Sequence, residues 1–146
     1  MGNHHCTSLV FRCMDFRITP AALSALFEAE GYCEGDYDLV SLAGSAKACL
    51  SDVPEEAALL LRQVALSKEL HKIREVVVLH HDNCGAYGIP DPREERRAQT
   101  ADLARIAEVV RGQFPELAVT TYLINGVLEG RLRLEKVSGT FFVQQI

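Results

Sequence analysis

Residues 8–17 read SLVFRCMDFR, an apolar run that ends in a cysteine, an acid and a base. A short apolar run of this kind predicts a β-strand that is buried on both faces. A second stretch, VVVLHHDNCGAYG at residues 76–88, repeats the arrangement, because its apolar run is followed by His81 and Cys84. Two buried strands that end in reactive side chains predict a functional site at one edge of a sheet.

Strand-like and helix-like segments alternate on either side of these two stretches. This alternation predicts an α/β fold with three layers: a mostly parallel four-stranded sheet of order 2-1-3-4, helices on both of its faces, and an antiparallel edge strand. Asn125-Gly126 predicts a turn before that edge strand. The expected strands are residues 8–14, 37–42, 75–79, 119–124 and 131–137, and the expected helices begin near residues 20, 52 and 93 and end near residues 31, 71 and 113.

Composition indicates one ordinary globular domain that covers residues 1–146. Hydrophobic residues make up 48% and charged residues 24% of the chain, which is a typical globular balance. The apolar runs are much shorter than the about 20 residues that cross a bilayer, and the first residues lack the pattern of a secretory signal. We therefore expect a cytoplasmic protein with no membrane partner. The formal net charge of −5 repels phosphate backbones, so nucleic acid is not an expected partner.

The five cysteines do not suit a disulfide framework, because their number is small and odd. In a reducing compartment we expect thiols that are free, catalytic or metal-bound. Cys33 and Cys49 have no reactive neighbours in the sequence and are expected to be small buried hydrophobes. Cys13 and Cys84, which stand beside acidic, basic or imidazole side chains, are the thiols with a predicted role.

The two strand ends are predicted to meet. With the strand order 2-1-3-4, the first and third strands are neighbours at the point where the order reverses, and ligands of open parallel sheets bind there. Cys13, His81 and Cys84 would then share one crevice. Two thiolates and an imidazole suit Zn²⁺ in tetrahedral geometry, and three protein ligands leave a fourth position open, as in catalytic zinc sites. The alternative is a core cysteine with an unrelated His-x-x-Cys turn.

Asp15 and Arg17 follow the first strand at a spacing that lets both side chains enter the same crevice. An aspartate next to an arginine has a lowered pKa and stays ionised. Asp15 is therefore expected to accept a hydrogen bond from a zinc-bound hydroxide or to ligate the zinc itself. A simple salt bridge within the loop is the alternative for this pair.

Together, Cys13-Met-Asp-Phe-Arg17 and His81-Asp-Asn-Cys84-Gly85 resemble the paired signatures of the β-class carbonic anhydrases, C-x-D-x-R and H-x-x-C-G. Ala43-Gly44 and the segment 122–137 are also similar to that family. The resemblance implies Zn²⁺ bound by the two cysteines and the histidine, with an Asp-Arg dyad that orients a zinc-bound hydroxide. It implies an enzyme, a carbonic anhydrase-like zinc lyase, whose small-molecule substrate is CO₂ or bicarbonate, interconverted by reversible hydration. It also implies a homodimer or a higher homo-oligomer.

The chain departs from the family pattern at several positions. Phe16 stands where the family commonly has serine, Asn83 where it has aspartate, and Ser41-Leu42 where it has Arg-Asn. Only 12 residues precede Cys13, so we expect the N-terminal helical arm of the family to be absent. These departures put efficient CO₂ hydration in question and favour two alternatives.

The first alternative is a hydrolase of a related small molecule such as COS or CS₂, in which Phe16 and Leu42 would line an apolar pocket. The second is a catalytically silent zinc-binding protein in which Asp15 is the fourth ligand. If the chain is an enzyme, the site needs a proton carrier. His80, next to His81 in the sequence, is a candidate.

Four other segments are predicted to have no part in the site. The His-His-Cys run at residues 4–6 offers metal-binding groups, but we expect this terminus to fray. His71 is expected to be a favourable charge at a helix C-terminus rather than a ligand. The run REERR at residues 93–97 is expected to be a solvated helix face, and the apolar tail at residues 138–146 is expected to pack on its own domain or on a partner subunit.

Overall fold

The structure is a computed structural model that describes residues 4–138, and within that range it holds a five-stranded sheet of order β2-β1-β3-β4-β5. The first four strands run parallel, and β5 is antiparallel to β4. The predicted order and the antiparallel edge are thus confirmed. Residues 139–146, which hold nearly all of the apolar tail, lie outside the described residues. The strands are β1 (Ser8–Cys13), β2 (Tyr37–Leu42), β3 (Glu75–His81), β4 (Ala118–Asn125) and β5 (Arg133–Ser138).

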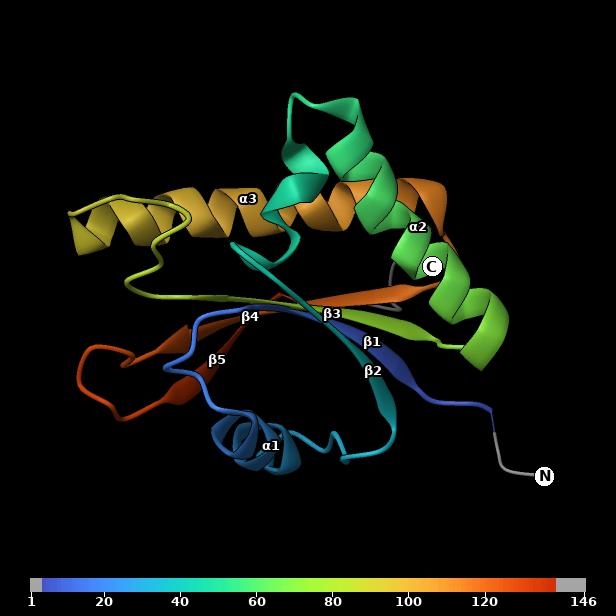
Figure 1. The fold of residues 1–146 in the computed structure, drawn as a ribbon, viewed down its shortest axis with the longest axis horizontal. Helices are drawn as coiled ribbons and strands as arrows, with labels where there is room; N and C mark the ends of the chain where they lie inside the picture. Colours follow the sequence, from blue (N-terminus) through green and yellow to red (C-terminus); the bar gives the residue numbers. More distant parts are fainter. Residues whose placement is uncertain (1–3, 139–146) are drawn as a thin grey trace, which may run out of the picture.

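Helices cover both faces of the sheet (Figure 1). Helix α1 (Pro20–Ala29) lies on one face, and α2 (Pro54–His71) and α3 (Pro92–Gln113) lie on the other, together with a 3₁₀ helix, η1 (Ser45–Leu50), that the sequence did not predict. This is the predicted three-layer α/β arrangement. Among the described residues, no helix combines the length and apolar character needed to cross a membrane.

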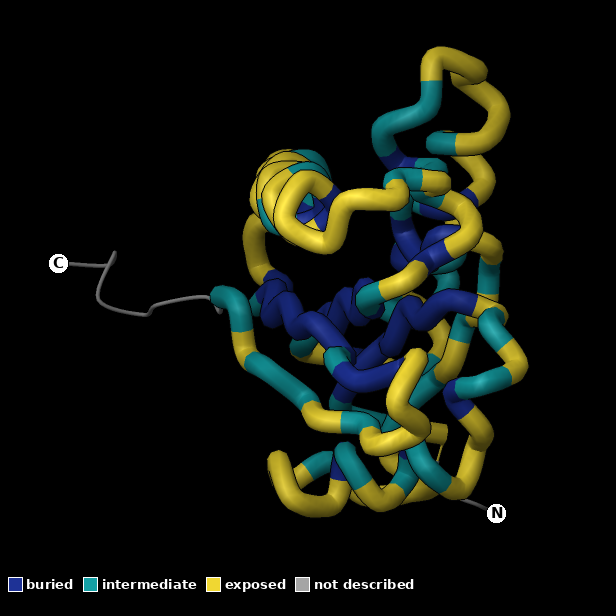
Figure 2. Tube along the Cα trace, turned by 90° about the vertical axis from the view of Figure 1, so that its left-hand side faces the viewer, coloured by how far each residue is buried: buried dark blue, intermediate teal, exposed yellow. Residues whose placement is uncertain are grey.

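The core consists of two apolar clusters separated by the sheet. One cluster joins β1, β3 and β4 to η1, α2 and α3, and the other joins the same strands to α1. Strand β1 is buried along its whole length and feeds both clusters, because successive side chains alternate between the faces: Leu9 and Phe11 face one cluster and Val10 faces the other. Figure 2 shows the buried strands enclosed between more exposed helices.

Two differences from the predicted elements affect the site. Strand β3 continues to His81, two residues beyond its predicted end, because its pairing with β4 continues as far as His81 and Ile124. The predicted Asn125-Gly126 turn is the start of a longer loop before β5 begins at Arg133. This loop is attached to the end of β3, since the Asp82 carboxylate accepts the backbone N–H groups of Gly126 and Val127 at 2.9 and 3.0 Å.

Gly126 is needed where this loop turns back on itself. Its φ is +88°, and a Cβ atom there would overlap the carbonyl oxygen of Arg131. We expect Gly126→Ala to lower the free energy of unfolding by about 2–4 kcal/mol, because positive φ and a backbone clash act together. Gly130→Ala is the matched control: Gly130 has a φ of +68°, but a Cβ atom there would meet no atom within 4 Å, so the expected loss is only about 1 kcal/mol. Urea unfolding measures both, and equal losses would contradict the clash.

Candidate metal centre

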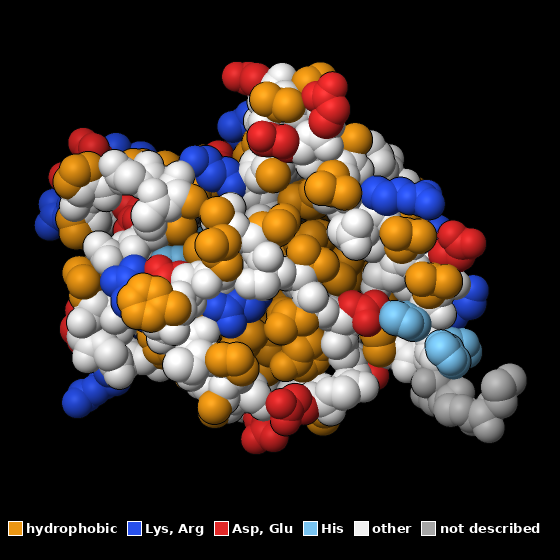
Figure 3. Space-filling view, viewed as in Figure 1, with side chains coloured by type: hydrophobic (Ala, Val, Ile, Leu, Met, Phe, Trp, Pro, Cys, Tyr) orange, Lys and Arg blue, Asp and Glu red, His pale blue; other side chains and the backbone are white. Residues whose placement is uncertain are grey.

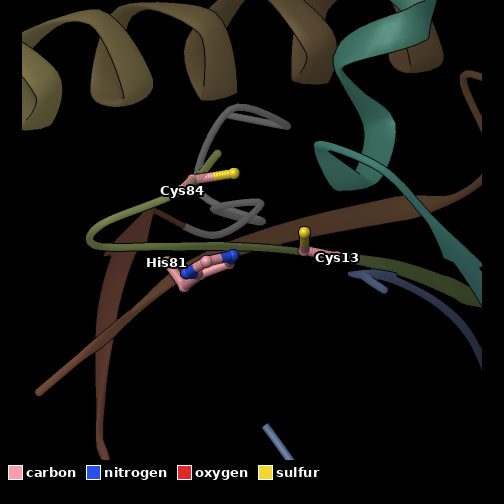
Figure 4. A group of neighbouring side chains, drawn as sticks. All are labelled: Cys13, His81 and Cys84. Atoms are coloured by element: carbon pink, nitrogen blue, oxygen red, sulfur yellow. The ribbon is translucent and has the colours of Figure 1, made fainter. Parts of the chain in front are cut away.

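The ends of β1 and β3 bring Cys13, His81 and Cys84 together (Figure 4). Cys13 is the last residue of β1, His81 is the last residue of β3, and Cys84 lies in the loop that follows. One ligand atom from each side chain lies within 4.8 Å of the others, and all three residues are buried. The structure therefore brings the three predicted ligands together, although 68 positions separate Cys13 from His81.

The donor set fits a Zn²⁺ ion. His81 Nδ1 lies 2.6 Å from the carbonyl oxygen of Asp82, so Nδ1–H donates to it and, in the neutral imidazole, Nε2 carries the lone pair. Within the described residues that Nε2 atom is buried and has no hydrogen-bond partner. Zn–S and Zn–N bonds of about 2.3 and 2.0 Å hold tetrahedral ligands about 3–4 Å apart, so a small side-chain movement would complete the site.

The two thiols at the centre differ in acidity because they face each other. The pKa of Cys13 is lowered, chiefly because the Cys84 thiol is placed to donate a hydrogen bond to its sulfur. The same pairing, together with burial, raises the pKa of Cys84. One sulfur is therefore ready to be a thiolate, which is the form that binds metal.

The predicted Asp15–Arg17 pair is formed at the edge of this centre. Arg17 binds the carboxylate of Asp15 through two nitrogens, Nε to Oδ1 at 3.0 Å and Nη2 to Oδ2 at 2.7 Å. These contacts lower the pKa of Asp15 to about 2. Asp15 Oδ2 lies 3.7 Å from His81 Nε2, but Asp15 does not belong to the group of ligand atoms that lie within 4.8 Å of one another.

Asn83, one of the departures from the family pattern, holds Arg17 in place. Arg17 donates to the Asn83 side-chain oxygen at 2.8 Å and to its backbone carbonyl at 2.9 Å. Asn83 has a φ of +51°, a left-handed conformation that asparagine tolerates better than most residues. The residue therefore joins the loop that carries Cys84 to the loop that carries Asp15.

Two buried polar residues of α3, which the sequence reasoning missed, bind the loop that carries Cys84. Glu95 is 4% exposed, and its carboxylate accepts the backbone N–H groups of Asn83 at 2.7 Å and Cys84 at 2.8 Å. Gln99, one turn later, donates to the carbonyl of His81 at 2.7 Å. The prediction of a solvated face at residues 93–97 is wrong for Glu95. Leu103, Gln99 and Glu95 are spaced four residues apart, so they lie on the same buried face of α3. This helical spacing was the sequence signal that could have predicted the burial of Glu95.

Replacing Glu95 with glutamine is expected to lower the free energy of unfolding by about 1–3 kcal/mol, because an amide NH₂ then faces a buried N–H that needs an acceptor. The measurement is urea unfolding of the metal-free chain, which separates this effect from zinc binding. Glu94→Gln is the matched control, since Glu94 is exposed on the same turn. If the two variants unfold alike, the carboxylate does not support the loop.

Arg12, the first residue of the RCMDFR motif, is also buried and was given no role from the sequence. It is 6% exposed, and it donates to the carbonyls of Cys13 at 2.5 Å and Asp15 at 3.0 Å. The guanidinium thereby fixes the backbone on both sides of the turn that leaves β1. Arg12 is a positioning residue for the predicted ligand and for the dyad.

The structure does not favour three other interpretations of the sequence. Phe16 is 87% exposed, whereas the sequence interpretation placed it in the wall of an apolar pocket. Cys33 is exposed, contrary to the prediction, because it falls in the loop between α1 and β2, whereas Cys49 is buried as expected. His80 is buried against Tyr87, and burial lowers its pKa to about 4, which does not favour it as a carrier of protons to solvent.

Comparison with known proteins agrees with this arrangement. The fold is that of the β-class carbonic anhydrases: the structure superposes on one of two tetrameric β-carbonic anhydrases of Sordaria macrospora with a TM-score of 0.63, at 14% identity, over 96% of this chain and 84% of that one. A β-carbonic anhydrase of Trichomonas vaginalis gives a TM-score of 0.60, at 16% identity, over 97% of this chain and 88% of that one.

The chain belongs to the protein family described as "Putative carbonic anhydrase", whose family model matches residues 3–136. It is a divergent member of the β-carbonic anhydrase family, as the two motifs predicted. Two uncharacterised proteins are also similar in sequence. One, from Rickettsia conorii, is 30% identical over 86% of this chain and 72% of its own length, and one from Rickettsia bellii is 27% identical over 86% and 82%.

Proposed function

We propose that this chain is a cytoplasmic, zinc-dependent lyase that hydrates CO₂ reversibly to bicarbonate, with Cys13, His81 and Cys84 as the metal ligands and Asp15 and Arg17 as the catalytic dyad. The observation that carries the proposal is the buried cluster of two thiols and the His81 imidazole, whose Nε2 accepts no hydrogen bond from the described part of the chain. Membership of the family and the likeness to β-carbonic anhydrases support it. We also propose that the chain acts as one domain and as a homo-oligomer, since a structural neighbour is described as tetrameric.

Zinc held by three protein ligands lowers the pKa of water in its fourth position toward about 7, which makes a nucleophile available at neutral pH. The work of the chain is to place and orient that solvent molecule. Asp15 is kept ionised by Arg17 and therefore acts as an acceptor for an O–H group beside His81. Its contact with Arg17 through two nitrogens restricts rotation of the carboxylate. Asn83 restricts Arg17 in turn.

Two observations weigh against the alternatives, the contacts of Asp15 and the exposure of Phe16. Both carboxylate oxygens of Asp15 accept hydrogen bonds from Arg17, which does not favour Asp15 as a fourth metal ligand. A pocket specialised for COS or CS₂ was expected to use Phe16, and that side chain is exposed. Leu42 lines a separate apolar hollow between β2 and α2, with Val40 and Leu60.

The test is zinc analysis of the purified full chain combined with stopped-flow CO₂ hydration. We expect bound zinc, hydration above the uncatalysed rate, loss of activity with a chelator, and recovery when Zn²⁺ is returned. A zinc-loaded, folded chain that does not accelerate CO₂ hydration would contradict the proposed activity. Release of sulfide from COS by that same preparation would then identify the hydrolase alternative.

A further inference from the structure

A second group of metal-ligating side chains lies at the other end of the sheet. Ligand atoms of Cys6, Asp38 and His71 lie within 4.8 Å of one another, and all three residues are half-buried. Cys6 precedes β1, Asp38 is the second residue of β2, and His71 is the last residue of α2. Strands rise about 3.3 Å per residue, so the seven steps from Cys6 to Cys13 separate this group from the candidate centre by roughly 20 Å.

The segment that carries Cys6 is held firmly, contrary to the expectation that this terminus frays. The backbone N–H of Cys6 donates to the carbonyl of His71 at 3.0 Å. Thr7 is held on both sides, since its hydroxyl donates to the Asp36 carboxylate at 2.6 Å and its carbonyl accepts the N–H of Arg74 at 2.8 Å. The thiol of Cys6 is therefore fixed next to the C-terminal end of α2.

The side chains of Asp38 and His71 contact each other directly. His71 Nδ1 lies 2.7 Å from Asp38 Oδ2, and the buried hydroxyl of Ser67 donates to the same oxygen at 2.6 Å. Supporting hydrogen bonds of this kind orient carboxylates that ligate metals. The His4 ring stacks beside His71 with its centroid 6.3 Å away. Figure 3 shows histidine side chains gathered with an acidic one at this edge of the molecule.

The donor types identify the kind of ion. A thiol sulfur, an imidazole nitrogen and a carboxylate oxygen are the three donor classes that Zn²⁺ accepts, whereas Mg²⁺ and Ca²⁺ require oxygen ligands. An aspartate–histidine pair alone would be an ordinary surface ion pair, which contributes little to stability. Cys6 makes this pair different, because its sulfur completes a mixed donor set drawn from three separate segments of the chain.

We propose that Cys6, Asp38 and His71 form a second Zn²⁺ site that ties the N-terminal segment to β2 and α2. The side chains of His71 and Asp38 are 34% and 30% exposed, so solvent has access to complete the coordination of the ion. The site is separate from the proposed catalytic centre, and its role is to stabilise the fold. His71, interpreted from the sequence as a helix-end charge, is then a ligand, and Cys6 acquires a role that the sequence did not support.

The first test counts zinc. The full chain is dialysed against buffered Zn²⁺, and the bound metal is measured by mass spectrometry for the wild type and for Cys6→Ser, His71→Ala and Cys84→Ser. We expect two ions per chain in the wild type and one in each variant, with none in the Cys6→Ser/Cys84→Ser double variant. Cys33→Ser, which changes an exposed cysteine outside both groups, should keep two.

The second test follows the Cys6 thiol directly and does not depend on the candidate centre. In the Cys84→Ser chain, Zn²⁺ should slow alkylation of Cys6 by at least tenfold, and in Cys84→Ser/His71→Ala it should not. Circular dichroism checks that each variant is folded. If Cys6→Ser and His71→Ala bind as much zinc as the wild type, or if Zn²⁺ does not protect Cys6, the second site is overturned. A wild-type zinc content in Cys84→Ser would count only against the candidate catalytic centre.

Discussion

Replacing Asp15 with asparagine is expected to lower kcat/KM for CO₂ hydration by about 100-fold or more while leaving the zinc content unchanged. The Arg17 guanidinium donates two hydrogen bonds to the Asp15 carboxylate and the Arg17 backbone N–H donates a third, and asparagine has only one oxygen to accept them. The asparagine oxygen would turn toward Arg17, which leaves the NH₂ group on the side of His81. A donor would then replace the acceptor that the proposed mechanism requires there.

The measurement is stopped-flow CO₂ hydration with zinc analysis of the same samples. Asp52→Asn is the matched control, because Asp52 is exposed and remote from the centre in the chain, and its activity should equal that of the wild type. A fully active Asp15→Asn enzyme would remove Asp15 from the catalytic role. Loss of zinc together with activity would instead assign Asp15 to the metal.

Replacing Cys84 with serine is expected to abolish CO₂ hydration and to remove the zinc held at the candidate centre. A serine hydroxyl remains protonated at neutral pH and is a poor substitute for a thiolate, and Cys13 and His81 alone supply only two ligands. A metal that binds only the folded chain stabilises it, so loss of the site is expected to remove that stabilisation as well. The thermal midpoint of Cys84→Ser should therefore rise less on addition of Zn²⁺ than that of the wild type.

Cys33→Ser is the matched control for this variant, since Cys33 is an exposed cysteine outside the centre. Zinc titration, thermal unfolding and CO₂ hydration are measured on both. If Cys84→Ser bound zinc as tightly as the wild type and remained active, the proposed ligand set would be wrong.

The architecture and the meeting of the two strand ends were predictable, because they follow from local patterns and a general rule of sheet topology. The apolar runs before Cys13 and His81 define adjacent buried strands, and parallel strands present their carboxyl ends at the same edge. The order of the strands is as predicted. The proximity of two residues 68 positions apart thus followed from strand order alone.

The contacts that support the site were not predictable in the same way. Glu95 stands among arginines and glutamates, so its local sequence is that of an exposed helix face, and only its four-residue spacing from Gln99 indicates that it is buried. Asn83 was noted as a departure from a motif, and its contact with Arg17 depends on the path of two loops. Cys6, Asp38 and His71 come from three segments of the chain, and no local sequence pattern predicts how these segments lie relative to one another.

The loop from Asp82 to Cys84 is fastened at three successive residues. Asp82 binds the loop before β5, Asn83 binds Arg17, and Cys84 binds Glu95. All three contacts are between protein groups, so we expect the loop to keep its shape without an ion. Zinc uptake here should consequently carry a small conformational-entropy penalty, unlike uptake by zinc fingers, which fold only when the ion binds. After removal of a bound ion, the loop would remain in the conformation that binds another ion.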